Sequence, residues 1–169
     1  LMPQVEEVKE KGYEILYLTD YADEFVVQVL QNYDNKKFVN VASSEVNLEN
    51  EEEKKEVEKL NTESKDLLDK MKDVLKDKVT NVKFTNSLKK HPVCLTSEGA
   101  ISTGMEKVLN SMPTNEKVKA STVLSINASH PIAKKIKELY KTNPEEIEKY
   151  TKILYAQAKL IEGLTLDNP

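Results

Sequence analysis

The amino-acid sequence predicts an α+β fold, in which a small α/β unit precedes a mixed domain with a short three-stranded sheet. Apolar residues recur at three- and four-residue spacing over several long stretches, which is typical of amphipathic helices. Short runs rich in β-branched and aromatic residues lie between these stretches and predict strands. A charged segment poor in apolar residues separates the two parts. We therefore expect a first unit over 1–43, a charged link over 44–56 and a second domain over 57–169.

The first unit has the order helix, strand, helix, strand. Residues 3–11 predict the end of a helix, and residues 13–18 (YEILYL) predict a strand. Asp20 is expected to cap a helix over residues 20–31. Residues 37–42 (KFVNVA) predict a second strand, which is parallel to the first if the helix between them is a true crossover. The expected inner face of that helix consists of Phe25, Val26, Val29 and Leu30.

The second domain begins with a long helix and contains three short strands. Apolar residues keep a three-four rhythm over residues 52–76, which predicts a helix of roughly 35 Å. Asn61 and Thr62 are the point at which this long leading helix could break into two. The strands are expected at residues 79–85, 92–96 and 122–127.

An amphipathic helix is expected between the second and third of these strands. Ser102 or Thr103 can cap it, and Pro113 stops it. Fully burying its five large apolar side chains would be favourable by roughly 8 to 15 kcal/mol. The apolar face must therefore meet the core of its own domain, a second subunit or an unrelated polypeptide. That face consists of Ile101, Met105, Val108, Leu109 and Met112.

Two further helices are expected near the end of the chain. Pro131 starts a short one, and Asn143 is a strong N-cap for a helix over residues 144–162. The last helix carries apolar residues on more than one side, so it needs an extra packing partner, in this chain or in another. One side is expected to hold Ile147, Tyr150, Leu154, Gln157, Ala158 and Ile161, and the other Ile153, Ala156 and Leu160.

Composition excludes several classes of function. The 169 residues are 38% hydrophobic and 32% charged, with a formal net charge of −4. No apolar run approaches the roughly 18 residues of a membrane helix, so no membrane partner is expected. Lysines are interleaved with acidic residues, which argues against nucleic acid as a partner. The single cysteine, Cys94, excludes an internal disulfide and fits a reducing compartment such as the cytoplasm, where we expect it to be a buried hydrophobe.

No set of residues indicates catalysis. His91 and His130 both precede proline in expected turns, and a structural role is favoured for each. The two histidines and one cysteine lie far apart, so no zinc pattern exists. The densest acidic group is explained by helix capping and consists of Asp20, Asp23 and Glu24. We therefore expect a chain that is not an enzyme, without catalytic, cofactor-binding or metal-binding residues.

Five stretches resemble, in the same order, bacterial members of the heat-shock protein 90 family of chaperones. No single stretch is a catalytic signature, but the conserved order of five makes the resemblance specific to that family over nearly the whole chain. The stretches are GYEILYLTDYADEF (12–25), KDLLDKMKDVLKDKVTNVKFTNSL (65–88), PVCLTSEGAISTGMEKVL (92–109), INASHPI (126–132) and LYAQAKLIEGLTLDNP (154–169).

The resemblance implies a non-catalytic part of a larger chaperone. Residues 1–43 would end the family's middle domain, and residues 57–169 would form most of its C-terminal dimerisation domain without the terminal helix. The family is homodimeric and ATP-dependent, and it handles unfolded or partly folded client proteins. Its ATP and magnesium site and the arginine that assists hydrolysis lie in earlier domains. The resemblance therefore implies no cofactor in this chain and a weakened homodimer.

The resemblance also implies two sets of site residues. The client-contacting helix of the family falls on Ile101, Met105, Val108, Leu109 and Met112. The alternative is a non-catalytic protein-interaction module in which this helix is wholly core. The family's dimer interface falls on Ile147, Tyr150, Ile153, Leu154, Gln157, Ala158, Leu160 and Ile161.

Overall fold

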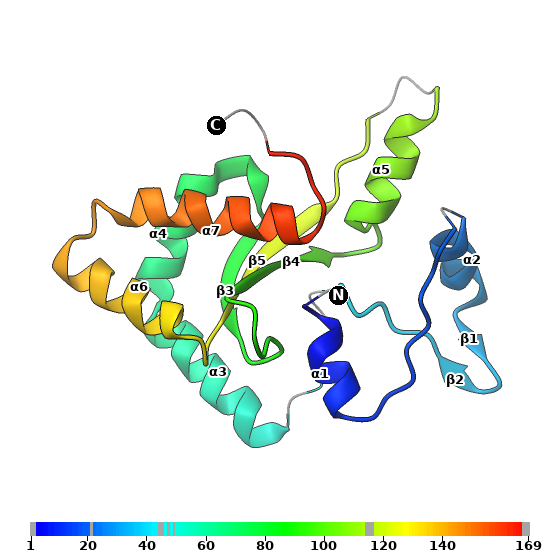
Figure 1. Ribbon diagram of the computed structural model, residues 1–169, viewed down its shortest axis with the longest axis horizontal. Coiled ribbons are helices and arrows are strands. Elements are labelled where there is room, and N and C mark those ends of the chain that lie inside the picture. Colours follow the sequence, from blue (N-terminus) through cyan, green and yellow to red (C-terminus); the bar gives the residue numbers. More distant parts are fainter. Residues whose placement is uncertain are drawn as a thin grey trace.

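The computed structural model has the expected α+β fold (Figure 1). The residues that it describes are 3–20, 22–43, 46, 48, 50–113 and 117–166. In chain order, the elements are α1 (Val5–Glu10), α2 (Asp23–Leu30), β1 (Asn32–Tyr33), β2 (Lys36–Lys37), α3 (Glu51–Glu63), α4 (Lys65–Leu75), the short 3₁₀ helix η1 (Lys76–Lys78), β3 (Asn81–Thr85), β4 (Val93–Glu98), α5 (Thr103–Ser111), β5 (Ser121–Asn127), α6 (Pro131–Thr142) and α7 (Ile147–Ile161).

The central sheet confirms the three strands that were expected in the second domain. Its order is β3-β5-β4, with β3 parallel to β5 and β4 antiparallel to it. Because side chains alternate along a strand, one face of the sheet is apolar and the other is mostly polar. The apolar face is fully buried and consists of Val82, Phe84, Val93, Leu95, Leu124 and Ile126.

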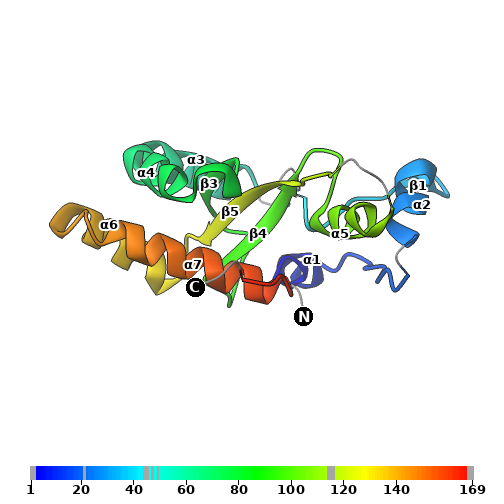
Figure 2. The ribbon, with the colours of Figure 1, turned by 90° about the horizontal axis from the view of Figure 1, so that it is seen from above.

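Two helices cover the apolar face of the sheet. Helix α4 packs against β3, α7 packs against β4, and the two helices also contact each other. Figure 2 shows this arrangement, with α3 and α4 near β3 and with α6 and α7 near β4. The core is therefore built from α4, α6, α7 and one face of the sheet.

The long leading helix divides at a different residue from the one expected. It breaks between α3 and α4 at Ser64, and it begins at a capping box formed by Asn50 and Glu53. Asn61 does not interrupt the helix: its Nδ2 donates to the Val57 carbonyl one turn back, and its side chain also bonds both backbone groups of Phe84 in β3.

The first unit differs from its sequence-based description. Residues 13–18 form no strand, and the pairing that occurs is the antiparallel hairpin β1–β2, so the expected strands at 13–18 and 37–42 and their parallel arrangement are wrong. Asp34 and Asn35 have φ angles of 49° and 58°, a conformation that suits a tight hairpin turn. The turn brings β1 and β2 together, so these two short segments pair. The β propensity of residues 13–18 is not enough to form a strand, because a strand needs a neighbouring strand to pair with.

The expected inner face of α2 is also exposed in large part. Phe25 is half-buried, whereas Val26, Val29 and Leu30 are exposed. A three-four spacing shows that residues share a helix face, but it does not show what covers that face. Residues 44, 45, 47 and 49 of the expected link lie outside the described residues, and the division of the chain at 44–56 remains a prediction.

Candidate interaction surfaces

Helix α5 carries the residues expected to contact client proteins, and it projects beyond the sheet next to α2 (Figure 1). Ser102 is its N-cap, as expected, and the Ser102 hydroxyl accepts a 3.0 Å hydrogen bond from the N–H of Met105. The helix ends at Ser111, immediately before Met112 and Pro113.

The five apolar residues of this segment do not share one environment. Met105 is only 6% exposed, whereas Met112 is 45% exposed. Ile101, Val108 and Leu109 are half-buried between these extremes. The helix therefore turns Met105 toward its own chain and leaves Met112 available at its far end.

Two polar residues of α2 contact the first turn of α5. Gln28 Nε2 lies 2.8 Å from the carbonyl oxygen of Ala100 and 3.1 Å from Met105 Sδ. Glu24 Oε2 accepts a 2.8 Å hydrogen bond from the Ser102 hydroxyl. The sequence did not single out these contacts, because they join residues more than 70 positions apart. No local pattern predicts such a pairing.

Helix α7 has one face in the core and one face that nothing in the described chain covers. Ile147, Leu154 and Ala158 are buried, and Ile161 is half-buried. The outward face contains Tyr150, Ile153 and Leu160, which are 38%, 50% and 61% exposed, together with the exposed Gln157.

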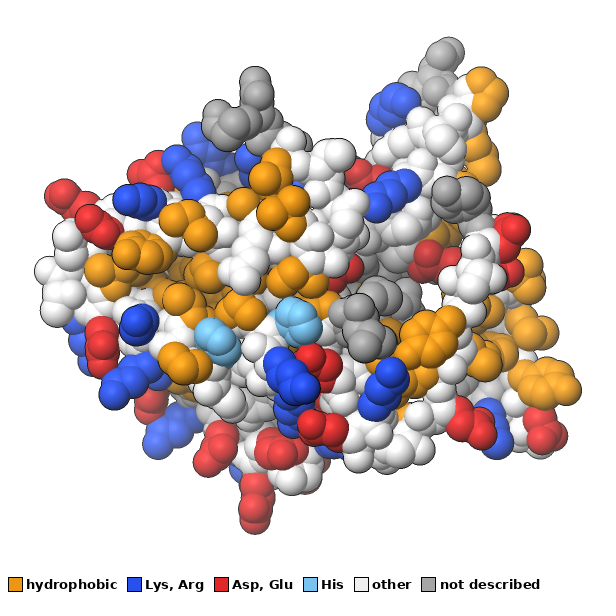
Figure 3. All heavy atoms as spheres, in the orientation of Figure 1, with side chains coloured by type: hydrophobic (Ala, Val, Ile, Leu, Met, Phe, Trp, Pro, Cys, Tyr) orange, Lys and Arg blue, Asp and Glu red, His pale blue; other side chains and the backbone are white. Residues whose placement is uncertain are grey.

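The division of α7 differs from the one expected. Tyr150 and Gln157 are exposed together with Ile153 and Leu160, although three-four spacing also aligns both of them with buried Leu154. Tyr150 and Gln157 therefore lie where the outward face borders the buried one. Figure 3 shows hydrophobic side chains along α7 and a second group over α2. An exposed apolar stripe of this kind marks a surface for protein contact more often than an isolated apolar residue does.

Cys94 and the two histidines have structural environments. Cys94 is buried, as expected, and burial raises the pKa of its thiol to about 12, so the thiol stays protonated and unreactive. His130 is the N-cap of α6, where its Nδ1 accepts the N–H of Ile132. His91 Nδ1 lies 3.1 Å from Glu6 Oε1.

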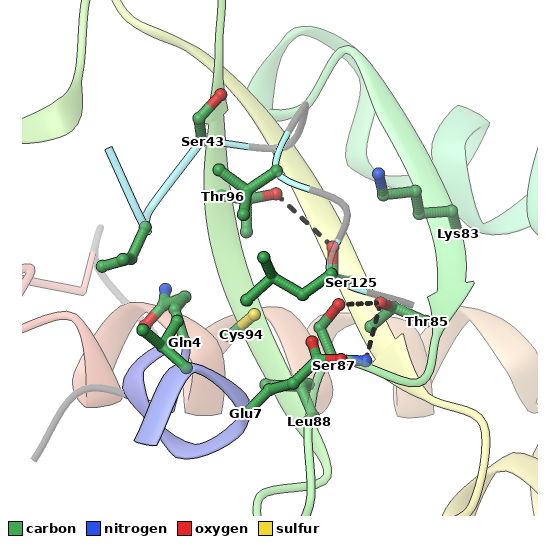
Figure 4. A pocket seen from close by; sticks show the side chains of 14 residues that line it. Gln4, Glu7, Ser43, Lys83, Thr85, Ser87, Leu88, Cys94, Thr96 and Ser125 are labelled. Atoms are coloured by element: carbon green, nitrogen blue, oxygen red, sulfur yellow. Dashed lines mark hydrogen bonds between the residues drawn. The ribbon is translucent and has the colours of Figure 1, made fainter. Parts of the chain in front are cut away.

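A small pocket lies on the polar face of the sheet, between α1 and the three strands (Figure 4). Its volume is about 40 Å³, which is enough for a few water molecules and too small for a nucleotide. Lys83, Thr85, Cys94, Thr96 and Ser125 line it from the sheet. The Oε1 atom of Gln4, another lining residue, is buried without a hydrogen-bond partner in the described structure.

The described residues form neither a metal-binding cluster nor a membrane-spanning helix. Over these residues, no three side chains of the His, Cys, Asp and Glu types gather closely enough to hold a metal ion. None of the helices in the same part of the chain has the length and apolar character that crossing a membrane requires.

An α+β fold that leaves apolar faces of its helices uncovered is typical of protein-interaction domains. The family model described as "Hsp90 protein" matches residues 1–169, and the chain belongs to this family. This finding confirms the resemblance that the sequence carries.

Relatives named Chaperone protein HtpG match almost the whole chain. Those from Clostridium botulinum (strain Loch Maree / Type A3) and Alkaliphilus oremlandii are each 47% identical over 168 residues, and the one from Bacillus subtilis (strain 168) is 42% identical over 168 residues. Each alignment covers 99% of this chain and 27% of the relative. The chain therefore spans about a quarter of the length of these relatives.

Proposed function

We propose that this chain is part of a molecular chaperone that assists protein folding, and that it supplies a contact surface for unfolded proteins and a homodimer interface. Membership of the Hsp90 family and the name that the relatives carry support the chaperone role. The observation that carries the two surfaces is the presence of uncovered apolar residues on α7 and at the end of α5.

The proposed client surface is the apolar side of α5, formed by Ile101, Met105, Val108, Leu109 and Met112. Met112 is exposed, and the flexible, polarizable side chain of methionine can repack against partners of different shapes. Because Met105 is buried, its participation requires α5 to move.

The proposed dimer interface is the outward stripe of α7, formed by Tyr150, Ile153, Gln157 and Leu160. An isologous contact places the same stripe of two copies around a two-fold axis, so that each large apolar side chain gains a partner. Ile147, Leu154 and Ala158 support this interface from within, because they belong to the core that α7 shares with the sheet, and Ile161 is half-buried at the end of the same helix.

We further propose that this chain has no catalytic role of its own. ATP and magnesium would bind elsewhere in the longer protein, whose cytoplasmic stress response this segment would serve. Cys94 is buried and protonated, His130 caps α6, and His91 bonds to Glu6. These environments support a role in binding rather than in catalysis.

Sedimentation equilibrium of the 169-residue chain tests the dimer interface. We expect the chain to self-associate with rising concentration, and the double variant Ile153→Asp, Leu160→Asp to remain monomeric at the same concentrations. The control variant Lys149→Asp changes an exposed residue of α7 outside the stripe and should associate like the parent chain. Equal association of the double variant would reject this interface.

Fluorescence anisotropy with labelled, reduced and carboxymethylated α-lactalbumin tests the client surface. We expect Met112→Ser to weaken binding several-fold while the free energy of unfolding changes by less than about 0.5 kcal/mol. Lys107→Ser, on the polar side of α5, is the control. Unchanged binding by Met112→Ser would contradict the client surface.

The second candidate is an interaction module in which the apolar face of α5 is wholly core. The burial of Met105 favours this alternative, but only at that one residue. Under this alternative, Met112→Ser would lower the free energy of unfolding by about 2 kcal/mol or more, as large-to-small core substitutions do.

A further inference from the structure

The first turn of α5 is held by side chains of α2. Ser102, the N-cap of α5, donates its hydroxyl hydrogen to Glu24 Oε2 over 2.8 Å while its oxygen accepts the N–H of Met105. Gln28 Nε2 lies within hydrogen-bond distance of both the Ala100 carbonyl and Met105 Sδ. Helix α2 thus contacts the N-cap of α5, the residue two positions before that cap and the buried methionine of α5.

The approach of the two helices is close at Gly104. A Cβ atom at this position would lie 3.2 Å from Glu24 Oε2 and 3.5 Å from Ser102 Oγ. The other oxygen of Glu24 is 3.3 Å from Asn40 Nδ2, so the carboxylate is held from both sides. The absence of a side chain at Gly104 allows Glu24 to reach the N-cap.

The other bonds of α5 join it to the segment that follows it and to the sheet. Asn110 exchanges two hydrogen bonds with the backbone of Val118, and Glu106 accepts the N–H of Ala120. The Asn110 bonds hold the end of the helix to the segment that follows it, and the Glu106 bond holds the last residue of the first turn to the same segment. On the sheet side, the Thr103 N–H donates to Ser97 Oγ over 3.3 Å, which is a long hydrogen bond.

We propose that Glu24 and Gln28 are positioning residues that keep Met105 turned inward, so that a displacement of α2 enlarges the apolar face of α5. The inference rests on the proposed function of α5 as a client-contact helix. Met105 lies three, four and seven residues before Val108, Leu109 and Met112, so all four share one face of α5. Exposure of the Met105 side chain would therefore extend this apolar face by one turn of the helix. Residues of the first unit would thereby regulate the client surface of the second.

Oxidation of methionine by hydrogen peroxide tests whether Met105 is turned inward. The folded 169-residue chain is oxidised first and then digested, and mass spectrometry of the peptides measures the sulfoxide at each methionine. Exposed methionine is oxidised to its sulfoxide, so each chain contains its own references. Met112 is the exposed reference, and Met71, which is 0% exposed in α4, reports global unfolding.

We expect Gln28→Ala and Glu24→Ala each to raise the ratio of Met105 to Met112 oxidation by about fivefold, since each removes hydrogen bonds of ordinary strength. Glu24→Gln keeps an acceptor for Ser102 and should leave the ratio nearly unchanged. Gln31→Ala removes the same side chain from the end of α2 and is the matched control. Parent-like ratios in both alanine variants, with Met71 protected, would overturn the inference and leave the proposed function intact.

Binding of labelled, reduced and carboxymethylated α-lactalbumin separates the two proposals. If Met105 joins the client surface, Gln28→Ala strengthens binding several-fold, and Met105→Ser in the same chain removes that gain. A second outcome is that Gln28→Ala raises Met105 oxidation without changing binding, while Met112→Ser still weakens binding. In that case the regulatory inference fails and the client surface stands. If Met112→Ser also leaves binding unchanged, the proposed client surface fails.

Discussion

Gln4 Nε2 donates a hydrogen bond to Glu162 Oε1 over 2.6 Å and so joins the residue before α1 to the residue that ends α7. The same nitrogen also donates to the carbonyl oxygen of Leu95 in β4. Burial raises the pKa of the Glu162 carboxyl, and the Gln4 hydrogen bond and the charge of Lys107 offset only part of this effect. The end of the proposed dimer helix is thus fixed by a partly buried carboxylate.

Glu162→Gln is expected to stabilise the chain at neutral pH, because the amide oxygen still accepts from Gln4 and no charge is buried. Since the pKa of Glu162 is higher in the folded chain, its favourable contribution is fully present below the unfolded value of about 4.3 and is lost as pH rises through the folded value. Urea unfolding at several pH values should therefore show a gain that grows from pH 4 to pH 7. The control Glu145→Gln, at an exposed residue, should show no such trend. Parallel pH profiles for Glu162→Gln and the parent chain would contradict the assignment.

Glu6→Gln is expected to lower the free energy of unfolding by about 1 kcal/mol at pH 7. Burial alone would raise the pKa of Glu6, but the N–H groups of Lys90 and Lys89 and the nearby His91 outweigh it and hold the pKa below its usual range. The stability that Glu6 contributes is therefore present above about pH 4.3 and is lost as pH falls through the lower folded value. Urea unfolding at pH 7 and below pH 4 measures this dependence.

A second carboxylate of α1 supplies the control for Glu6. Glu10 Oε2 is 3.8 Å from Lys89 Nζ, and exposed pairs at such distances contribute little. Glu10→Gln should change the free energy of unfolding by less than about 0.5 kcal/mol. An equal effect of both substitutions would show that general charge, and not the bonds of Glu6, stabilises this end of the sheet.

Leu154→Ala and Leu160→Ala should differ in their effects on monomer stability and on self-association, although both shorten a leucine of α7. Leu154 is 4% exposed, and we expect its loss to cost about 2 to 5 kcal/mol in thermal or urea unfolding of the monomer. Leu160 is outward, and its loss should cost less than about 0.5 kcal/mol in the monomer while weakening self-association. Similar losses of monomer stability would mean that the outward stripe is covered within the chain.

Asn61→Leu is expected to lower the free energy of unfolding by about 2 kcal/mol, measured by urea unfolding. Asn61 Oδ1 accepts the N–H of Phe84 over 2.8 Å and Asn61 Nδ2 donates to the Phe84 carbonyl over 3.1 Å, so the side chain pairs with the free edge of β3. The substitution leaves both backbone groups without a partner. Thr62→Ala, which removes an exposed bond to the Glu58 carbonyl, is the control and should change stability by less than about 0.5 kcal/mol. A neutral Asn61→Leu would contradict this role.

Much of the second domain could be predicted because its signals are local. The three strands, the cap at Ser102 and the buried state of Cys94 follow from neighbouring residues, and the structure confirms them. The expected N-cap at Asn143 is wrong, because Asn143 ends α6 and α7 begins at Ile147 without a side-chain cap. The strands expected at 13–18 and 37–42 failed for the opposite reason, because a strand forms only where another strand pairs with it.

The candidate surfaces were only half predictable. Periodicity correctly indicated that α5 and α7 are amphipathic and that α7 carries apolar residues on two sides. It did not separate exposed Tyr150 and Gln157 from buried Leu154, with which they are aligned, and it gave no means of telling buried Met105 from exposed Met112. The contacts of Glu24 and Gln28 with α5 were missed entirely, because they join distant parts of the chain.

By itself, the sequence determined the family, the α+β class and the order of the helices and strands from residue 50 onward, since each depends on the order of residues or on short-range spacing. Only the tertiary structure decided which apolar faces are covered, where Asn61 and Gln4 find their partners, and which methionine of α5 points inward. Burial and long-range hydrogen bonds depend on which segments meet in space, and the spacing of residues along one segment does not contain that information.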